Sequence, residues 1–251
     1  MSFDEPARSS GAPNAPRVAF IAALDAECAS LRKQATRAGS WLVVQSGPGA
    51  ARAAVAAERA VDAGATLLVS WGLAGGLDAK LVPGTVVVPR RVLQRDAEPL
   101  AVDAGWHSRL AALADEFPLE QGDLLTAHAA LESAEAKHAA AAATRAVAVD
   151  MESAAIAAVA ARAGVPFVVL RVVIDGVGDA LPRGAEQWID ELGYRRLAPT
   201  LRAVVNLRQW RPLLTLAKRF RTASGVLDRL AQALAGRRLL APDVSARRAG
   251  S

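Results

Sequence analysis

Two apolar runs separated by an alanine-rich segment constrain the fold of this chain more than any other feature. Residues 147–149 and 168–174 are rich in Val and Ile, and residues 151–163 between them are mostly alanine with helical spacing. A strand–helix–strand unit of this kind builds a parallel sheet that helices cover. An acid stands at or near the end of each run, Glu152 and Asp175, and open parallel sheets bind ligands outside the carboxyl ends of their strands.

Each of these acids also has a purely structural interpretation. Glu152 stands where a carboxylate would complement the positive end of the helix that follows it. Asp175 precedes Gly176, and an Asp-Gly pair commonly forms a turn. The residues alone therefore leave open both a functional and a structural role for the two carboxylates.

The same alternation of strands and helices runs through most of the 251 residues, a length that suits one sizeable core. The pattern predicts strands over residues 17–23, 41–45, 66–71, 85–89, 146–149 and 167–174. It predicts helices over residues 25–38, 50–63, 106–117, 132–143 and 151–163. We expect an α/β fold, namely a three-layer α/β/α sandwich with a central mixed sheet.

Two glycine-rich segments follow predicted strands. Ser46-Gly47-Pro48-Gly49 stands before a predicted helix, where backbone N–H groups could meet an anion or a hydroxyl-rich ligand. Residues 72–76 predict a tight turn with a close backbone approach, and a purely conformational role is the alternative. Neither segment has the spacing of a dinucleotide fingerprint or the Lys-Ser/Thr of a P-loop. Because the three histidines show no metal-ligand spacing either, we expect no metal and no redox cofactor.

Positive charge is concentrated near the C-terminus. Residues 195–238 contain eleven Lys or Arg and one acid, Asp228, which gives +10 there and, from the whole-chain +5, leaves −5 elsewhere. Leucines and valines recur at helical spacing beside Trp210, a composition typical of a helix that lies on a membrane surface. Alternatively, the apolar stripe closes the core and the arginines face water. We expect a basic, amphipathic helical extension over residues 194–240 that packs on a domain of residues 17–193.

The two ends of the chain are expected to be disordered. Residues 1–16 are rich in Pro, Gly and Ser and lack the apolar run of a signal peptide, and residues 241–251 form a short tail. No segment reaches the roughly 18 uncharged apolar residues of a spanning helix, since Arg171 interrupts the best candidate. The single cysteine, Cys28, is compatible with a reducing compartment. We expect a cytoplasmic protein, peripheral on the inner face of the membrane if the basic helices bind anionic lipid.

Five motifs follow one another in order within residues 17–179. They are Ala22-Ala23-Leu24-Asp25-Ala26-Glu27, Ser46-Gly47-Pro48-Gly49, Trp71-Gly72-Leu73-Ala74-Gly75-Gly76-Leu77, Val149-Asp150-Met151-Glu152-Ser153-Ala154-Ala155 and Arg171-Val172-Val173-Ile174-Asp175. Together they resemble the purine nucleoside phosphorylase and methylthioadenosine/S-adenosylhomocysteine nucleosidase superfamily, which implies a nucleoside phosphorylase-like fold. The basic extension is similar to the hopanoid-associated phosphorylase branch, whose members are linked to removing adenine from the lipid nucleoside adenosylhopane.

The resemblance implies distinct roles for three acids. Glu152 would bind the ribose 2′ and 3′ hydroxyls while Met151 packs against the sugar. Asp175 would protonate purine N7, so burial of its carboxyl should raise its pKa. Glu27 would activate the water that attacks C1′, and a carboxylate near the sugar stabilises the positive charge that develops in the transition state. Four further residues complete the expected substrate site: Gly47, Gly72, Leu73 and Ala74.

Departures from the family pattern bear on the reaction. Phosphorolytic relatives hold phosphate with arginines and a serine, whereas this chain has Glu27, Ser70 and Leu73 at the corresponding positions. A carboxylate would repel phosphate, so we expect hydrolysis, with phosphorolysis, in which phosphate is a co-substrate, as the alternative. Ile174 replaces the serine that usually precedes the catalytic aspartate and thereby removes a hydrogen-bond partner. Residues 128–131 lack the Asp and Phe of the usual adenine-stacking loop.

We therefore expect an enzyme that cleaves the N-glycosidic bond of a purine nucleoside, with adenine as the base and a lipid as the 5′ substituent. A catalytically decayed peripheral membrane protein on the same fold is the alternative from another class. The resemblance also implies assembly of the chain with copies of itself. The basic segment contains few aromatic residues for stacking and no known reading motif, so we expect no nucleic-acid partner.

Overall fold

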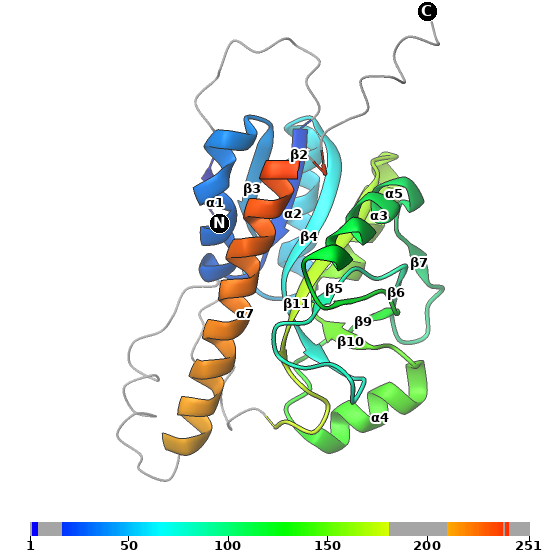
Figure 1. The fold of residues 1–251 in the computed structure, drawn as a ribbon. Helices are drawn as coiled ribbons and strands as arrows, with labels where there is room; N and C mark the ends of the chain where they lie inside the picture. The colour runs from blue at the N-terminus through cyan, green and yellow to red at the C-terminus, as the bar shows by residue number, and fades with distance from the viewer. Residues whose placement is uncertain (1, 5–16, 181–209, 238, 241–251) are drawn as a thin grey trace, which may run out of the picture.

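The computed structural model describes residues 2–4, 17–180, 210–237 and 239–240 (Figure 1). The strands in these ranges are β1 (Ser2–Asp4), β2 (Arg17–Ala22), β3 (Trp41–Gln45), β4 (Ala65–Gly76), β5 (Val86–Val87), β6 (Arg91–Leu93), β7 (Leu100–Ala101), β8 (Leu119–Glu120), β9 (Leu124–Thr126), β10 (Ala148–Asp150) and β11 (Phe167–Asp175). The helices are α1 (Asp25–Ala38), α2 (Ala50–Asp62), α3 (Ala104–Ala111), the short 3-10 helix η1 (Ala112–Asp115), α4 (Ala134–Thr144), α5 (Ser153–Ala163) and α7 (Trp210–Arg237). The predicted alternation of strands and helices is confirmed.

The described strands form one mixed sheet with β4 and β11 at its centre. Its order is β1-β3-β2-β4-β10-β9-β6-β7, while β11 pairs with β4 and β5, and β5 with β8. Helices α1 and α7 pack against each other (Figure 1). Helices α2 and α5 also pack against each other. The sheet has a hydrophobic core on each face, and successive residues of β2 point to opposite faces. Phe20 belongs to the core that α1 and α7 cover, and Ile21 belongs to the core that α2 and α5 cover. The expected three-layer arrangement is confirmed.

Strand β4 is longer than the sequence predicts and changes its partner along its length. Residues 65–70 pair in parallel with β2, and Gly75 and Gly76 pair antiparallel with β10. Strand β11 runs along the other edge from Leu68 to Gly75. The prediction of a turn over residues 72–76 is therefore wrong: pairing with β11 keeps this glycine-rich segment extended even after β2 has left it.

Strand β11 ends in an irregularity at Ile174. Val173 pairs with Ala74 and Asp175 pairs with Gly75, so one residue of β11 has no counterpart on β4. An extra residue of this kind re-aims the side chains that follow it. Ile174 is half-buried beside the core of α1 and α7, and Asp175 is buried.

Helix α7 closes the core that it shares with α1. Its buried residues recur at helical spacing: Ala223, Val226, Leu227, Leu230, Ala231 and Leu234. The second half of α7 therefore closes the core, as one of the two interpretations of the basic extension predicted. Residues 194–209 of the predicted extension lie outside the described residues. None of the helices in the described ranges has the length and apolar character needed to span a membrane.

The N-terminal segment differs in part from the expected disorder. Ser2, Phe3 and Asp4 pair antiparallel with β3, opposite Gln45, Val44 and Val43. The reason is that β3 offers a free edge whose backbone N–H and C=O groups need partners. The remainder of residues 1–16 and the predicted tail over residues 241–251 lie outside the described residues.

Candidate active site

Glu27 lies where β4 passes from one partner to the next. It belongs to the first turn of α1, is 3% exposed, and accepts the N–H of Leu24 through Oε2 at 2.9 Å. Its Oε1 accepts the N–H of Leu73 at 2.8 Å, in the stretch of β4 between the pairings with β2 and β10. The carboxylate thus accepts the hydrogen bond from a backbone N–H of β4 that neither β2 nor β10 pairs with. A Cβ on Gly72 would lie 2.5 Å from Oε1, so glycine is what allows this approach.

Arg171 is the cation of a buried cluster that contains three carboxylates. It stands in the middle of β11, 1% exposed, and its Nη2 lies 2.6 Å from Asp150 and 3.5 Å from Glu152. A Cβ on Gly72 would lie 2.9 Å from Nη1, which places Arg171 beside the same glycine as Glu27. Within the described part of the chain, its buried Nε has no hydrogen-bond partner.

Asp150 anchors this cluster to two elements of the fold. Its Oδ1 accepts the Thr126 hydroxyl on β9 at 2.7 Å, and its Oδ2 accepts the backbone N–H of Ser153 at 3.1 Å. The latter contact satisfies a free donor at the start of α5. The Ser70 hydroxyl accepts from Arg171 Nη2 at 2.8 Å. Serine and aspartate together therefore fix the orientation of the guanidinium.

The electrostatics of the cluster raise the pKa values of Glu27 and Glu152. Burial raises the pKa of Glu27 to about 7, against the opposing charge of Arg171 and the N–H groups of Leu73 and Leu24. Burial also raises the pKa of Glu152, again against the charge of Arg171, and Asp150 raises it further. For Arg171 itself burial lowers the pKa, but the carboxylates outweigh it and the net shift is upward. The guanidinium therefore stays charged while Glu27 titrates near neutrality.

Glu152 joins the glycine-rich segment before α2 to the cluster. Its Oε1 accepts the N–H of Gly49 at 2.9 Å, and its side chain is 9% exposed. Gly47 and Gly49 have φ of 82° and 98°, so this segment needs glycine for its conformation. Met151, next to Glu152, is half-buried. The structure thus brings Glu27, Glu152 and the motif of residues 46–49 together around Arg171.

Asp175 forms a second buried ionic site with a residue that the sequence analysis did not identify. Lys137 Nζ, on α4, lies 2.6 Å from Asp175 Oδ2, and the two side chains are 2% and 4% exposed. The ammonium also donates to the carbonyl oxygen of Gly176 at 3.0 Å. A Cβ on Gly75 would lie 3.3 Å from Asp175 Oδ1, which places this pair three residues along β4 from Gly72.

Burial raises the pKa of Asp175, while the charge of Lys137 and the hydrogen bond from it act in the opposite direction. The resemblance left Asp175 without the serine hydroxyl that Ile174 replaces. Lys137 supplies a donor in its place, from a different element of the fold. An alanine-rich helix with one lysine gave no signal for this contact, because a lysine on a helix usually faces water.

The other residues expected in the substrate site lie on β4 and just after β3. Leu73 and Ala74 continue β4 after Gly72, and Leu73 is half-buried. Gly47 lies two residues after the end of β3, and its carbonyl oxygen accepts a hydrogen bond from the hydroxyl of Ser46 at 2.8 Å. Among the described residues, no group of three or more His, Cys, Asp or Glu is placed to hold a metal ion.

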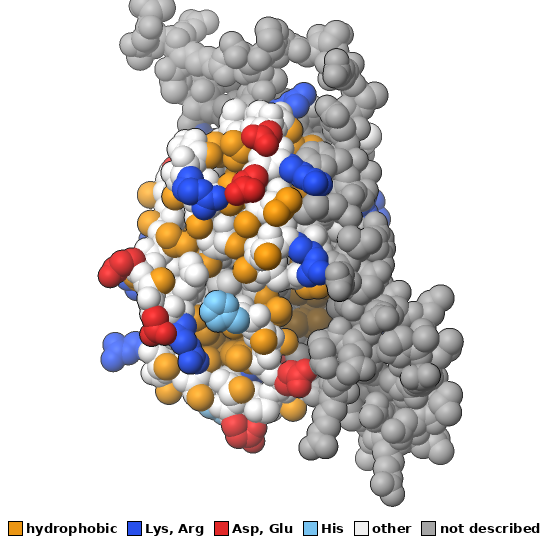
Figure 2. Space-filling view, turned by 180° about the vertical axis from the view of Figure 1, so that it is seen from behind, with side chains coloured by type: hydrophobic (Ala, Val, Ile, Leu, Met, Phe, Trp, Pro, Cys, Tyr) orange, Lys and Arg blue, Asp and Glu red, His pale blue; other side chains and the backbone are white. Residues whose placement is uncertain are grey.

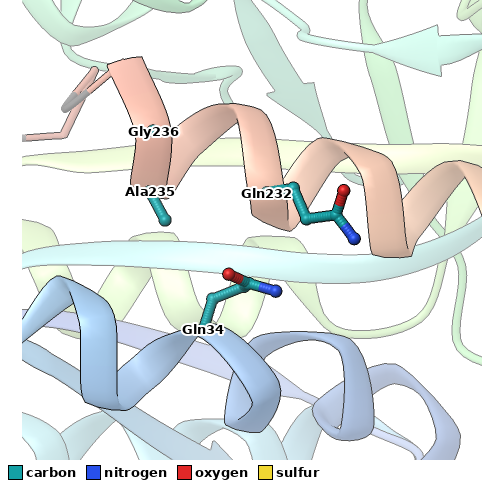
Figure 3. A pocket seen from close by; sticks show the side chains of 4 residues that line it. All are labelled: Gln34, Gln232, Ala235 and Gly236. Carbon is teal, nitrogen blue, oxygen red and sulfur yellow. The ribbon is translucent and has the colours of Figure 1, made fainter.

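A groove elsewhere on the surface is separate from these ionic sites. It lies between later turns of α1 and α7 and is lined by Gln34, Gln232, Ala235 and Gly236 (Figure 3). The groove presents two amides and no charged side chain. It therefore offers none of the acid or base chemistry found along β4.

Solved structures of nucleosidases share this fold. The 5′-methylthioadenosine/S-adenosylhomocysteine nucleosidase of Neisseria meningitidis, in complex with methylthio-immucillin-A, aligns with a TM-score of 0.67 and 21% identity over 88% of this chain and 99% of that one. S-adenosylhomocysteine nucleosidase of Streptococcus pyogenes aligns with a TM-score of 0.61 and 22% identity, over 82% and 98%. Futalosine hydrolase of Helicobacter pylori aligns with a TM-score of 0.62 and 16% identity, over 84% and 98%.

Sequence comparison gives the family. No curated protein sequence matches the chain. The sequence profile of the phosphorylase superfamily, however, matches residues 11–206, which include α1, the whole of β4 and β11, and both buried ionic sites. The chain is therefore an enzyme that belongs to the phosphorylase superfamily.

Proposed function

We propose that this enzyme hydrolyses the N-glycosidic bond of an adenine nucleoside. The observation that carries the proposal is the placement of three buried carboxylates, Glu27, Glu152 and Asp175, around residues 72–75 of β4. Gly72 and Gly75 are about 10 Å apart along an extended strand, so Glu27 and Asp175 stand beside separate points of β4. Nucleosidases of the same fold bind nucleoside analogues.

The three carboxylates have separate tasks in this mechanism. Glu152 binds the ribose hydroxyls, and Met151 packs against the sugar. Glu27 takes a proton from the water that attacks C1′, and its pKa of about 7 suits a base that works near neutral pH. Asp175 protonates N7, so adenine leaves as a neutral base. The negative surplus around Arg171 stabilises the positive charge that develops on the sugar.

The charge balance of the site supports water rather than phosphate as the nucleophile. Arg171 is the cation near Glu27, and Asp150 and Glu152 already neutralise it. The N–H of Leu73, which an anion could use, is taken by the Glu27 carboxylate. Phosphate binding needs unpaired positive donors, and it would also meet the charge of Glu27.

Adenine release from a panel of 5′-substituted adenosines tests the reaction. We expect adenine and a free sugar in phosphate-free buffer, with a rate that does not change when phosphate is added. Formation of a ribose 1-phosphate type product only in the presence of phosphate would establish phosphorolysis instead. No release of adenine under either condition would favour the catalytically decayed protein.

A lipid substituent at the 5′ position is the finer part of the proposal, with adenosylhopane as the expected substrate. Its support is the resemblance to the hopanoid-associated branch and the first half of α7. Leu214 there is 65% exposed, and Lys218 and Arg221 are exposed on the same helix. Apolar and basic side chains together suit an anionic membrane surface. On the reverse face of the molecule, positive and negative side chains are interspersed (Figure 2).

Vesicle binding tests this part separately. Removal of α7 is unsuitable, because residues such as Leu227 and Leu230 belong to the core. We therefore compare Leu214→Ser/Lys218→Ser/Arg221→Ser with the matched variant Val55→Ser/Arg59→Ser/Arg162→Ser, whose three side chains are exposed on α2 and α5. Only the first variant should lose co-sedimentation with phosphatidylglycerol vesicles and turnover of adenosylhopane in them. Equal co-sedimentation of the two variants would contradict the membrane proposal.

A further inference from the structure

We infer that Lys137 stores the proton that the purine receives, and that Asp175 relays it. This inference rests on the proposed function, since it assigns the source of the N7 proton in that reaction. The juxtaposition that carries it is a buried ammonium in direct contact with Asp175, the acid of the proposed reaction. Lys137 Nζ and Asp175 Oδ2 are 2.6 Å apart and shielded from water by α4, β4 and β11.

The contact has the geometry of a proton path. A separation of 2.6 Å is at the short end for a charge-assisted hydrogen bond. Lys137 Nζ is held from a second direction by the carbonyl oxygen of Gly176. Side-chain amines ordinarily keep their proton to a much higher pH than carboxyls, with reference pKa values of about 10.4 and 3.9. We therefore place the resting proton of the pair on nitrogen and take the carboxylate as its acceptor.

Other charged groups near Lys137 and Asp175 are either paired with each other or exposed to water, so they do not share the proton of this pair. Asp179, after β11, and Arg219, on α7, both act on Asp175, but they form their own ion pair at 2.6 Å. Glu135 and His138, also on α4, are exposed to water. Lys137 is thus the cation that balances Asp175.

Each proton and electron pair has a defined destination in the step. As the bond from C1′ to N9 breaks, its electrons pass to the purine. Lys137 gives its proton to the Asp175 carboxylate and becomes a neutral amine, while N7 takes that one proton on from Asp175, which ends the step as a carboxylate. Glu27 takes a proton from the attacking water, whose oxygen bonds to C1′. The proton on Glu27 then returns to Lys137 through solvent, so the net reaction consumes one water and releases neutral adenine.

Two substitutions separate proton storage from a structural role. Lys137→Met removes the stored proton, so Asp175 must hold the proton itself. Lys137→Arg keeps the positive charge, but a guanidinium does not release its proton. If Lys137 served only as a counter-ion, Lys137→Arg would retain activity, and Lys137→Met would move the alkaline limb of kcat/KM up rather than down.

The resting proton state can be measured without turnover. Aspartate labelled with ¹³C at Cγ reports by NMR whether Asp175 is ionised, and the spectrum of Asp175→Asn assigns its signal. We expect an ionised Asp175 at pH 7.5 in the wild type and a protonated one in Lys137→Met. A protonated Asp175 in the wild type would overturn the inference, whether or not adenine is released.

The pH profile of adenine release tests the transfer itself. For Lys137→Met we expect the alkaline limb of kcat/KM to move down by at least about one pH unit. For Lys137→Arg we expect kcat to fall about 100-fold with an unchanged KM. An alkaline limb that stays in place or moves up in Lys137→Met would overturn the inference. A wild type that releases no adenine would instead refute the proposed function, and the NMR measurement would still decide where the resting proton lies.

Discussion

The two buried ionic sites along β4 use opposite solutions to the burial of charge. Around Arg171, one permanent cation faces Asp150, Glu152 and Glu27, so the carboxylates, when ionised, exceed it by two charges. Around Asp175, one carboxylate faces one ammonium that can give up its proton. The first site therefore offers a surplus of negative charge when its carboxylates are ionised, and the second offers a movable proton. A positively charged sugar matches the first, and a basic purine nitrogen matches the second.

Removal of Arg171 should have the largest effect on stability, and it tests the difference between the two sites. Arg171→Met leaves three buried carboxylates without a counter-ion, and we expect a loss of about 3–5 kcal/mol in the free energy of unfolding, measured in urea at pH 7.5. Lys137→Met should cost clearly less, because it leaves one buried carboxylate without a counter-ion rather than three. Equal losses for the two variants would show that the sites do not differ in this way.

Asp175→Asn should abolish catalysis while keeping the fold. An amide cannot pass a proton to N7, and we expect adenine release to fall about 1,000-fold. The matched control is Asp179→Asn, four residues along the chain, which should stay within about fivefold of the wild type because Asp179 contacts Gly176 and Arg219 rather than Lys137. Turnover by Asp175→Asn at the wild-type rate would remove its assigned role.

The same substitution, glycine to alanine, can be made beside each site, at Gly72 and at Gly75, and its effects compared. In Gly72→Ala the new Cβ would lie 2.5 Å from Glu27 Oε1, so the carboxylate or β4 must move, and we expect kcat to fall about 100-fold. In Gly75→Ala the nearest atoms are 3.2 and 3.3 Å away, and a drop of about tenfold or less should follow. A larger loss in Gly75→Ala than in Gly72→Ala would contradict the assigned position of Glu27.

The smallest expected effect is a pH dependence that arises from Glu27 alone, in the Arg171 cluster. Because Glu27 must be ionised to act as a base, kcat/KM should fall about tenfold for each pH unit below a pKa of about 7. Glu27→Gln should lack this acid limb and retain only residual activity. The raised pKa also means that the folded state binds this proton more tightly than the unfolded state. The free energy of unfolding should therefore decline from about pH 4.5 to about pH 7, a slope that Glu27→Gln should reduce.

The sequence predicted the parts of the site that stand at strand and helix ends. Glu27, Glu152 and Asp175 each follow an apolar run, and a sheet brings such positions together. Their catalytic roles stay predictions. The helices and most strands were also predictable, because periodic burial fixes them.

The partners of these acids were not predictable for physical reasons. The sequence showed Arg171 as a charge that interrupts an apolar run and as part of a family motif, but it gave Arg171 no partner. Its burial depends on Asp150, which lies 21 positions earlier in the chain. Lys137 stands in an alanine-rich helix whose pattern does not distinguish a buried face from an exposed one. Residues 72–76 read as a turn because local preference favours bending, but their pairing with β11 is set by contacts about 100 residues away.

The packing of α7 on α1 has a consequence for the synthesis of the chain. Residues 25–38 emerge from the ribosome about 200 residues before the last turn of α7, at Arg237. At roughly 5–20 residues per second, the face of α1 and the sheet that awaits α7 stays uncovered for about 10–40 s. During that interval Leu31, Phe20 and Val43 belong to an open apolar surface. The nascent enzyme should therefore depend on chaperones until α7 has been synthesised, although its two ionic sites are encoded earlier.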